Sequence, residues 1–150
     1  MAILPVRLYT DKILHQPCEV ITDFSNLEEL AQSMLLTMIH YRGVGLAANQ
    51  IGVNKQLAAL HIENKSKYLI LANIKVLRYT KESTVELEGC LSCPGISVPM
   101  KRAKAVEIEA QKLNGEKIEL QFTDYDARIL QHEWDHLNGR LISDYLRKMV

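Results

Sequence analysis

The chain has 150 residues, enough for one compact domain and too few for two domains of ordinary size. Lys plus Arg and Asp plus Glu number 18 each, so the formal net charge is zero, which argues against a broad nucleic-acid-binding surface. No apolar run approaches the roughly 18 residues that a membrane span needs, and the first residues lack the apolar core of a signal peptide. We therefore expect one cytoplasmic domain over residues 1–150, with no membrane contact and no direct nucleic-acid readout.

The first predicted element is an amphipathic helix over residues 27–39. Apolar residues recur there at helical intervals until Gly43, and Ser25 and Glu28 have capping-box spacing at the start. This pattern predicts a helix with one buried face.

Strands are predicted next. The runs 57–62 and 68–77 are apolar and rich in β-formers, with a turn-prone segment between them. An Asn-Gly dipeptide at 114–115 separates alternating apolar residues at 106–110 and 118–122, which is typical of a β-hairpin.

A second helix is predicted near the end of the chain. Asp124 or Asp126 would cap it, its apolar spacing continues through residues 129–136, and Asn138 and Gly139 would stop it. The predicted fold class is α+β, with mostly antiparallel strands around this central helix.

This late helix carries an HExxH arrangement made by His132, Glu133 and His136. At about 100° per residue the two imidazoles project about 40° apart, so they can hold one metal ion. Glu133 is then placed to act as a general base. Two buried histidines without a metal would show the same spacing. A third ligand elsewhere in the sequence is therefore needed to distinguish a metal site from a structural pair.

The third ligand has three candidates. A long HExxHxxGxxH motif would place it at Ile142, which cannot bind a metal. Asp144 would serve in a zincin-type endopeptidase, which remains an alternative. Cys90, in the glycine- and proline-rich segment 88–95, is the better candidate, because one thiolate and two imidazoles leave an open position for water. Cys93 completes a CxxC, but no second ligand pair follows, so we expect it to be a small buried residue.

The glycine-rich segment 43–50 follows the first predicted helix. No Lys-Ser/Thr follows it, and the partial GxGxxG pattern breaks at Ala48, which argues against a phosphate loop. Its glycines leave an extended backbone edge open to a peptide, and Gln50 offers an amide donor.

Taken in order, the segments GVGLAANQ (43–50), EGCLS (88–92) and QHEWDHLNG (131–139) resemble the three signature motifs of the peptide deformylases, which remove the N-formyl group from nascent proteins. The resemblance covers almost the whole chain, and the chain is similar to a minimal member that ends soon after the third motif. It implies a formylmethionyl peptide as substrate, transient contact with the ribosome and a monomeric enzyme.

The resemblance implies that Cys90, His132 and His136 bind one divalent metal ion. Fe(II) is the expected native metal, although Zn(II), Ni(II) or Co(II) also suits these donors. Glu133 is implied to be the catalytic base that activates water for attack on the formyl carbon. We also expect Asp135 to be a structural partner of Arg102.

The remaining implied roles concern the substrate. The Gln50 amide and the backbone N–H of Leu91 would stabilise the developing oxyanion. The residues implied to bind the peptide or its methionine side chain are Gly43, Val44, Gly45, Tyr125 and Ile129.

Overall fold

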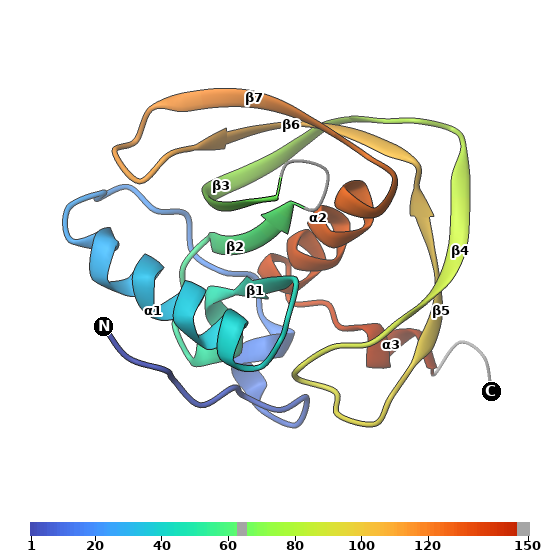
Figure 1. The fold of residues 1–150 in the computed structure, drawn as a ribbon, viewed down its shortest axis with the longest axis horizontal. Helices are drawn as coiled ribbons and strands as arrows, with labels where there is room; N and C mark the ends of the chain where they lie inside the picture. The colour runs from blue at the N-terminus through green and yellow to red at the C-terminus, as the bar shows by residue number, and fades with distance from the viewer. Residues whose placement is uncertain (63–65, 147–150) are drawn as a thin grey trace.

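The computed structural model describes residues 1–62 and 66–146 (Figure 1). Its helices are α1 (Leu27–His40), α2 (Asp124–Leu137) and α3 (Ile142–Leu146), with short 3-10 turns at η1 (Lys12–His15) and η2 (Ala48–Ile51). None of the helices in this part of the chain is long and apolar enough to cross a membrane.

The strands form two antiparallel sheets. The larger sheet has the order β1-β2-β3-β6-β7, and β4 pairs with β5 in a separate ribbon. The strands are β1 (Gly45–Ala47), β2 (Leu57–Ile62), β3 (Lys67–Tyr79), β4 (Ser83–Glu88), β5 (Val98–Ala103), β6 (Ala105–Gln111) and β7 (Lys117–Thr123). The predicted α+β class with antiparallel strands is confirmed, and β1 is an edge strand of its sheet.

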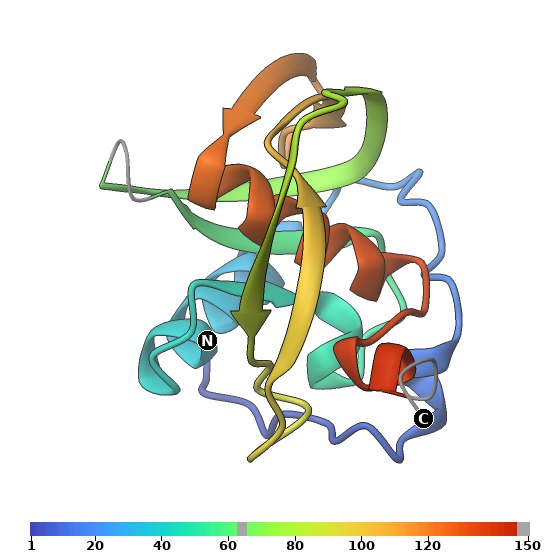
Figure 2. The same ribbon diagram turned by 90° about the vertical axis from the view of Figure 1, so that its right-hand side faces the viewer.

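The larger sheet is buried on both faces near β2. Leu57 and Ala59 point into a cluster shared with α1, whereas Ala58 and Leu60 point into a cluster shared with α2. Side chains alternate between the faces of a strand, so a strand covered on both sides has an unbroken apolar sequence. The ribbon of β4 and β5 crosses α2 (Figure 2).

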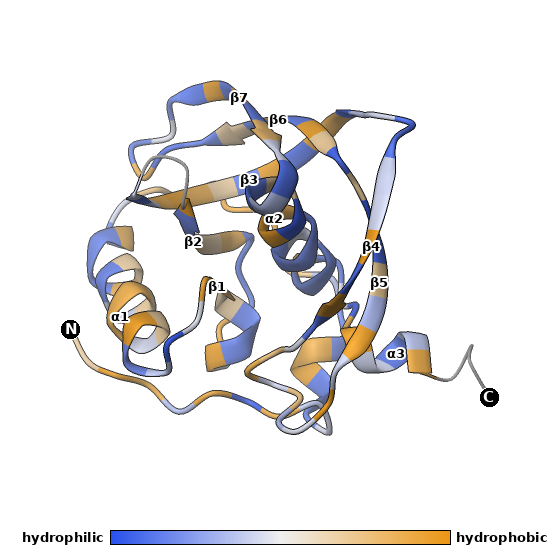
Figure 3. Ribbon diagram, turned by 45° about the vertical axis from the view of Figure 1, so that its right-hand side comes forward, coloured by the Kyte–Doolittle hydropathy of each residue, from blue (hydrophilic) through white to orange (hydrophobic). Residues whose placement is uncertain are grey.

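Helix α2 lies at the centre of the fold, although much of it is hydrophilic (Figure 3). Ten of its 14 residues are buried, among them Arg128, Glu133 and Asp135. Burying charged groups costs free energy unless they are paired or used for chemistry. The buried charged residues of α2 therefore indicate a functional site at the centre of the molecule.

Most predicted elements are confirmed. The run 57–62 coincides with β2, the run 68–77 lies inside β3, and the predicted hairpin is β6–β7. The predicted end of the second helix is also confirmed, because Asn138 is the C-cap and Gly139 follows with a φ of 74°.

The predicted helix caps are wrong. Asn26, with a φ of 61°, precedes α1, and the Ser25 hydroxyl instead donates to Asp23 at 2.6 Å. Helix α2 already begins at Asp124, so Asp124 and Asp126 lie in its first turn rather than before it. At α1 the Ser25 hydroxyl therefore makes a hydrogen bond within the preceding turn and does not cap the helix.

Candidate metal centre and active site

Three side chains with metal-binding atoms converge although they come from two distant segments. His132 and His136 lie one turn apart on α2, and their Nε2 atoms are 3.2 Å apart. Cys90 follows β4 and places its Sγ 3.3 Å from Nε2 of His136. One ligand atom of each residue lies within 4.8 Å of the others. The structure thus brings together the three residues that the sequence predicts as ligands.

The spacing and chemistry of these atoms fit a divalent transition metal. Nitrogen and sulfur ligands at about 2.0–2.3 Å from a tetrahedral ion lie roughly 3.3–3.7 Å apart. The two separations from Nε2 of His136, 3.2 Å to His132 Nε2 and 3.3 Å to Cys90 Sγ, are close to this range. Three protein ligands leave one position for water or substrate, which is typical of a catalytic site.

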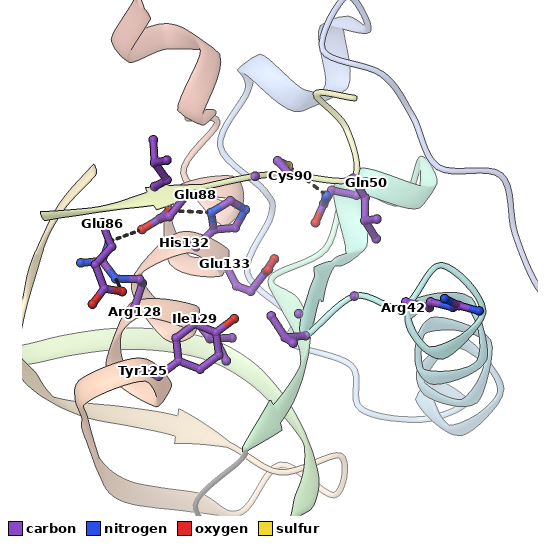
Figure 4. A pocket seen from close by; sticks show the side chains of 16 residues that line it. Arg42, Gln50, Glu86, Glu88, Cys90, Tyr125, Arg128, Ile129, His132 and Glu133 are labelled. Atoms are coloured by element: carbon purple, nitrogen blue, oxygen red, sulfur yellow. Dashed lines mark hydrogen bonds and ion pairs between the residues drawn. The ribbon is translucent and has the colours of Figure 1, made fainter. Parts of the chain in front are cut away.

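Glu88, the last residue of β4, orients the first histidine. It accepts a hydrogen bond from Nδ1 of His132 at 3.0 Å and from two nitrogens of Arg102 at 2.9 Å each. Arg128 donates to the same carboxylate at 2.7 Å. Although burial opposes ionisation, hydrogen bonds from His132 and Arg102 lower the pKa of Glu88 to about 2. The ionised Glu88 therefore holds the His132 ring with Nε2 turned toward the other ligands (Figure 4).

The expected partnership between Asp135 and Arg102 is confirmed. Arg102 Nη1 donates to Asp135 Oδ2 at 2.6 Å, and both side chains are buried. This ion pair joins β5 to α2, and Asp135 is not among the residues that line the cavity, so its role is structural.

Replacing Glu88 with glutamine is expected to weaken metal binding about 10- to 100-fold, because the His132 ring loses its charged acceptor. Competition with a chelator of known affinity measures this change. Glu86→Gln is the matched control, since Glu86 lies on the same strand and its side chain is 60% exposed. Equal metal affinity of Glu88→Gln and the parent chain would contradict the role given to Glu88.

Glu133 is the buried carboxyl beside the ligand group. It is 3% exposed, and its Oε2 has no hydrogen-bond partner among the described residues. Burial raises the pKa of this carboxyl to about 7. A carboxyl with a free oxygen and a near-neutral pKa is well suited to accept and return a proton at physiological pH.

Gly45 makes room for Glu133. A Cβ at this position would overlap Oε1 of Glu133 and lie 2.8 Å from its Cγ. The backbone of Gly45 is not in the left-handed region, so this contact alone explains why a larger residue does not fit.

Gly45→Ala is therefore expected to displace the Glu133 carboxyl and lower kcat about 100-fold, the cost typical of a misplacement near 1 Å. Steady-state hydrolysis of the substrate proposed below measures it. Gly89→Ala is the control, because a Cβ at Gly89 meets no atom closer than 4.0 Å. An unchanged kcat in Gly45→Ala would show that the carboxyl position is not critical.

The site opens into a cavity of about 410 Å³ between β1, β4 and α2 (Figure 4). Of the predicted site residues, those that line it are Gly43, Val44, Gly45, Gln50, Cys90, Leu91, Tyr125, Ile129, His132 and Glu133. His136 lies behind them and is 1% exposed. The structure therefore gathers all the predicted site residues around one cavity.

Six further lining residues were not predicted: Arg42, Glu86, Leu87, Glu88, Gly89 and Arg128. Helical spacing could have found Arg128, which precedes His132 by one turn on the same face of α2. Glu88 and Gly89 belong to the motif segment 88–92 but had no role assigned from the sequence, and Arg42, Glu86 and Leu87 lie just outside the motifs.

The Gln50 side chain has a fixed orientation. Its Oε1 accepts from the Ala47 N–H at 2.9 Å, and its Nε2 donates to Ser92 Oγ at 3.1 Å. The same Nε2 lies 3.7 Å from Cys90 Sγ. The amide donor of Gln50 is therefore held on the side of the metal ligands.

The structure does not support the alternative ligands. Asp144 Oδ2 accepts a hydrogen bond from the Leu141 N–H at 2.9 Å at the start of α3, and Asp144 is not in the ligand group found among the described residues. Cys93 is 1% exposed within an apolar cluster, as expected for a small buried residue.

A Cys-His-His metal group with a buried glutamate, facing a cavity beside an open strand edge, defines a metal-dependent hydrolase. The model of the family described as polypeptide deformylase matches residues 3–150. The chain belongs to this polypeptide deformylase family.

Named relatives agree with this assignment. A peptide deformylase of Thermotoga maritima is 39% identical over 140 residues, which cover 93% of this chain and 84% of the relative. Peptide deformylase 1 of Clostridium perfringens is 37% identical over 146 residues, covering 97% and 99% of the two chains.

Solved structures show the same fold. The crystal structure of the Thermotoga maritima peptide deformylase superposes with a TM-score of 0.92 at 36% identity, covering 96% of this chain and 97% of that one. A Met-Ala-Ser-bound class I type b peptide deformylase of Acinetobacter baumannii superposes with a TM-score of 0.91 at 32% identity, covering 96% and 99%.

Proposed function

We propose that this chain hydrolyses the N-formyl group of formylmethionine at the start of nascent polypeptides and releases formate and a free amino terminus. The observation that carries the proposal is the ligand group of Cys90, His132 and His136, with Glu133 beside it at a cavity next to the edge of β1. Membership of the polypeptide deformylase family supports the reaction.

Cys90, His132 and His136 would hold one divalent cation, which supplies Lewis-acid activation of water and of the formyl carbonyl when bound. Glu133 accepts the proton of the attacking water, because its free oxygen and raised pKa suit a general base. It then returns that proton to the amine nitrogen as the C–N bond breaks. Formate leaves with the oxygen of the water.

The developing negative charge on the formyl oxygen needs fixed donors. The Gln50 amide is held toward the metal ligands, and Leu91 follows Cys90 directly in the cavity wall. We assign the Gln50 side chain and the Leu91 N–H to this role, since donors fixed before the reaction stabilise a transition-state charge most effectively.

The substrate backbone would pair with the open edge of β1, where Gly43 and Gly45 leave no side chains in its way. The methionine side chain would enter between Val44, Tyr125 and Ile129. The Acinetobacter baumannii structure with bound Met-Ala-Ser supports a tripeptide in a cavity of this class.

Formate release from formyl-Met-Ala-Ser by anaerobically prepared protein tests the proposal. Metal content is measured on the same sample, and acetyl-Met-Ala-Ser is the matched control peptide. We expect release of formate with one metal ion per chain. If protein loaded with one metal ion released no formate, the substrate assignment would be wrong even though the family assignment stands.

We propose Fe(II) as the native metal. The donor set of one thiolate and two imidazoles is compatible with iron and equally with Zn(II), Ni(II) or Co(II). Elemental analysis of protein purified without oxygen decides between them.

We also propose that the chain acts as a monomer in the cytoplasm and contacts the ribosome only transiently. The zero net charge supports the absence of strong non-specific RNA binding. Sedimentation of the protein alone and with ribosomes tests both statements.

A further inference from the structure

The direction in which a bound peptide leaves the site follows from what flanks β1, given the proposed function. After β1 the chain enters η2 (Ala48–Ile51), whose residues are all buried, so no peptide can continue past that end. At the other end Gly43 is partly exposed and Arg42 is exposed. Because Glu133 lies against Gly45, a peptide whose formyl group is there must run toward Gly43 and Arg42, antiparallel to β1.

The register of such a peptide is set by strand geometry. Extended residues advance about 3.3 Å each, so paired strands advance one residue for one. If the formylated residue lies beside Gly45, the third residue lies beside Gly43, and the fourth meets the turn at Arg42, which lies outside β1. Arg42 is the arginine of the cavity wall that lies at this end of the site.

Arg42 is the one arginine of the cavity wall without a carboxylate partner among the described residues. Arg128 is neutralised by Glu86 at 3.3 Å and by Glu88 at 2.7 Å. No hydrogen bond or ion pair joins the Arg42 guanidinium to any residue that the structure describes. In Figure 4 it lies at the opposite end of the cavity from Glu88 and Arg128. Among the described residues, no carboxylate therefore competes with a ligand for this charge.

The backbone at Arg42 adds a second observation. Its φ is 57°, in the left-handed region, and its N–H donates to the Ile39 carbonyl at the end of α1. Glycine is the residue favoured in this conformation after a helix, and unfavourable backbone conformations cluster at functional sites. Arg42 thus occupies a backbone conformation that favours glycine.

We propose that Arg42 gives this enzyme a preference for acidic side chains at the third or fourth residue of the formylated peptide. The ligand is a carboxylate of the substrate chain itself. Arg42 acts as a specificity-determining residue and takes no part in bond breaking, so its effect falls mainly on KM.

Amidated pentapeptides test this inference, because amidation removes the terminal carboxylate. Formyl-Met-Ala-Ala-Ala-Ala-amide is the neutral reference, and Glu or Lys replaces one alanine at the second, third or fourth position. We expect kcat/KM to be about three- to tenfold higher for Glu than for Lys at the third or fourth position, as exposed ion pairs allow. The ratio should be near one at the second position and should shrink in 0.5 M NaCl.

Two variants assign the effect to the guanidinium. Arg42→Gly suits the left-handed backbone, so it is expected to fold and to bring the Glu/Lys ratio close to one. Arg42→Glu is expected to invert the ratio. Lys117→Ala is the matched control, since Lys117 is an exposed cation on β7 outside the cavity wall, and it should leave the ratio unchanged.

Equal kcat/KM for Glu and Lys at both positions would overturn the inference, as would a preference that survives in Arg42→Gly. These results leave the deformylase proposal intact, because formate still appears from the neutral peptide. No formate from the neutral peptide would instead reject the deformylase proposal, and the Arg42 inference with it.

Discussion

Replacing Glu133 with glutamine is expected to lower kcat for formate release about 10²- to 10⁴-fold, the range typical of a lost general base. Glutamine has the same shape but cannot accept a proton from water. Because Glu133 makes no ion pair and its Oε2 has no partner among the described residues, the substitution removes no structural interaction. Steady-state kinetics at saturating peptide, with metal content measured in parallel, check this result.

The metal content of Glu133→Gln should stay at one ion per chain, since the ligand group consists of Cys90, His132 and His136. Glu116→Gln, on the exposed loop between β6 and β7, serves as the control and should keep its activity. Glu133 would lose its role as base if the glutamine variant, fully loaded with metal, kept more than about a tenth of the parent kcat.

Cys90→Ala is expected to lose its metal and with it the formate-releasing activity. Removal of a ligand should weaken metal binding by more than the roughly 10- to 100-fold cost of losing an outer hydrogen-bond partner. Dialysis against a weak chelator followed by elemental analysis measures the loss. Cys18→Ala is the matched control, because Cys18 is a buried cysteine in a different apolar cluster.

The same experiment separates the two ligand sets considered from sequence. Asp144→Ala should retain the metal, because the Asp144 carboxylate accepts the Leu141 N–H rather than facing the histidines. Metal retained by Cys90→Ala and lost by Asp144→Ala would reverse our assignment and favour a zincin-type centre.

The elements that could be predicted from the sequence are those that one local residue pattern determines. The HExxH spacing places two imidazoles on one helix face whatever surrounds them, and the apolar run 57–62 predicts the strand β2. The Asn-Gly turn likewise predicts its hairpin without help from the rest of the fold.

The features that could not be predicted depend on contacts between residues far apart in the sequence. Glu88 accepts hydrogen bonds from His132 and Arg128, which lie 44 and 40 residues away in the sequence. No short motif spans such a separation. Strand β4 was not predicted, although Val85 and Leu87 alternate with Glu86 and Glu88, because this run is short and its residues 83–87 are exposed rather than half-buried. Strand β4 is held in place by its pairing with β5 and by the ion pairs of Glu88.

The edge strand β1 has a consequence for how this protein avoids aggregation. Open strand edges pair readily with other chains, and natural proteins protect them by keeping them short or charged. Here β1 has only three residues, the buried turn of η2 closes one end, and the turn that contains Arg42 precedes the other. An edge of this length accommodates the first few residues of a peptide but gives a second folded copy too few hydrogen bonds to start a fibre.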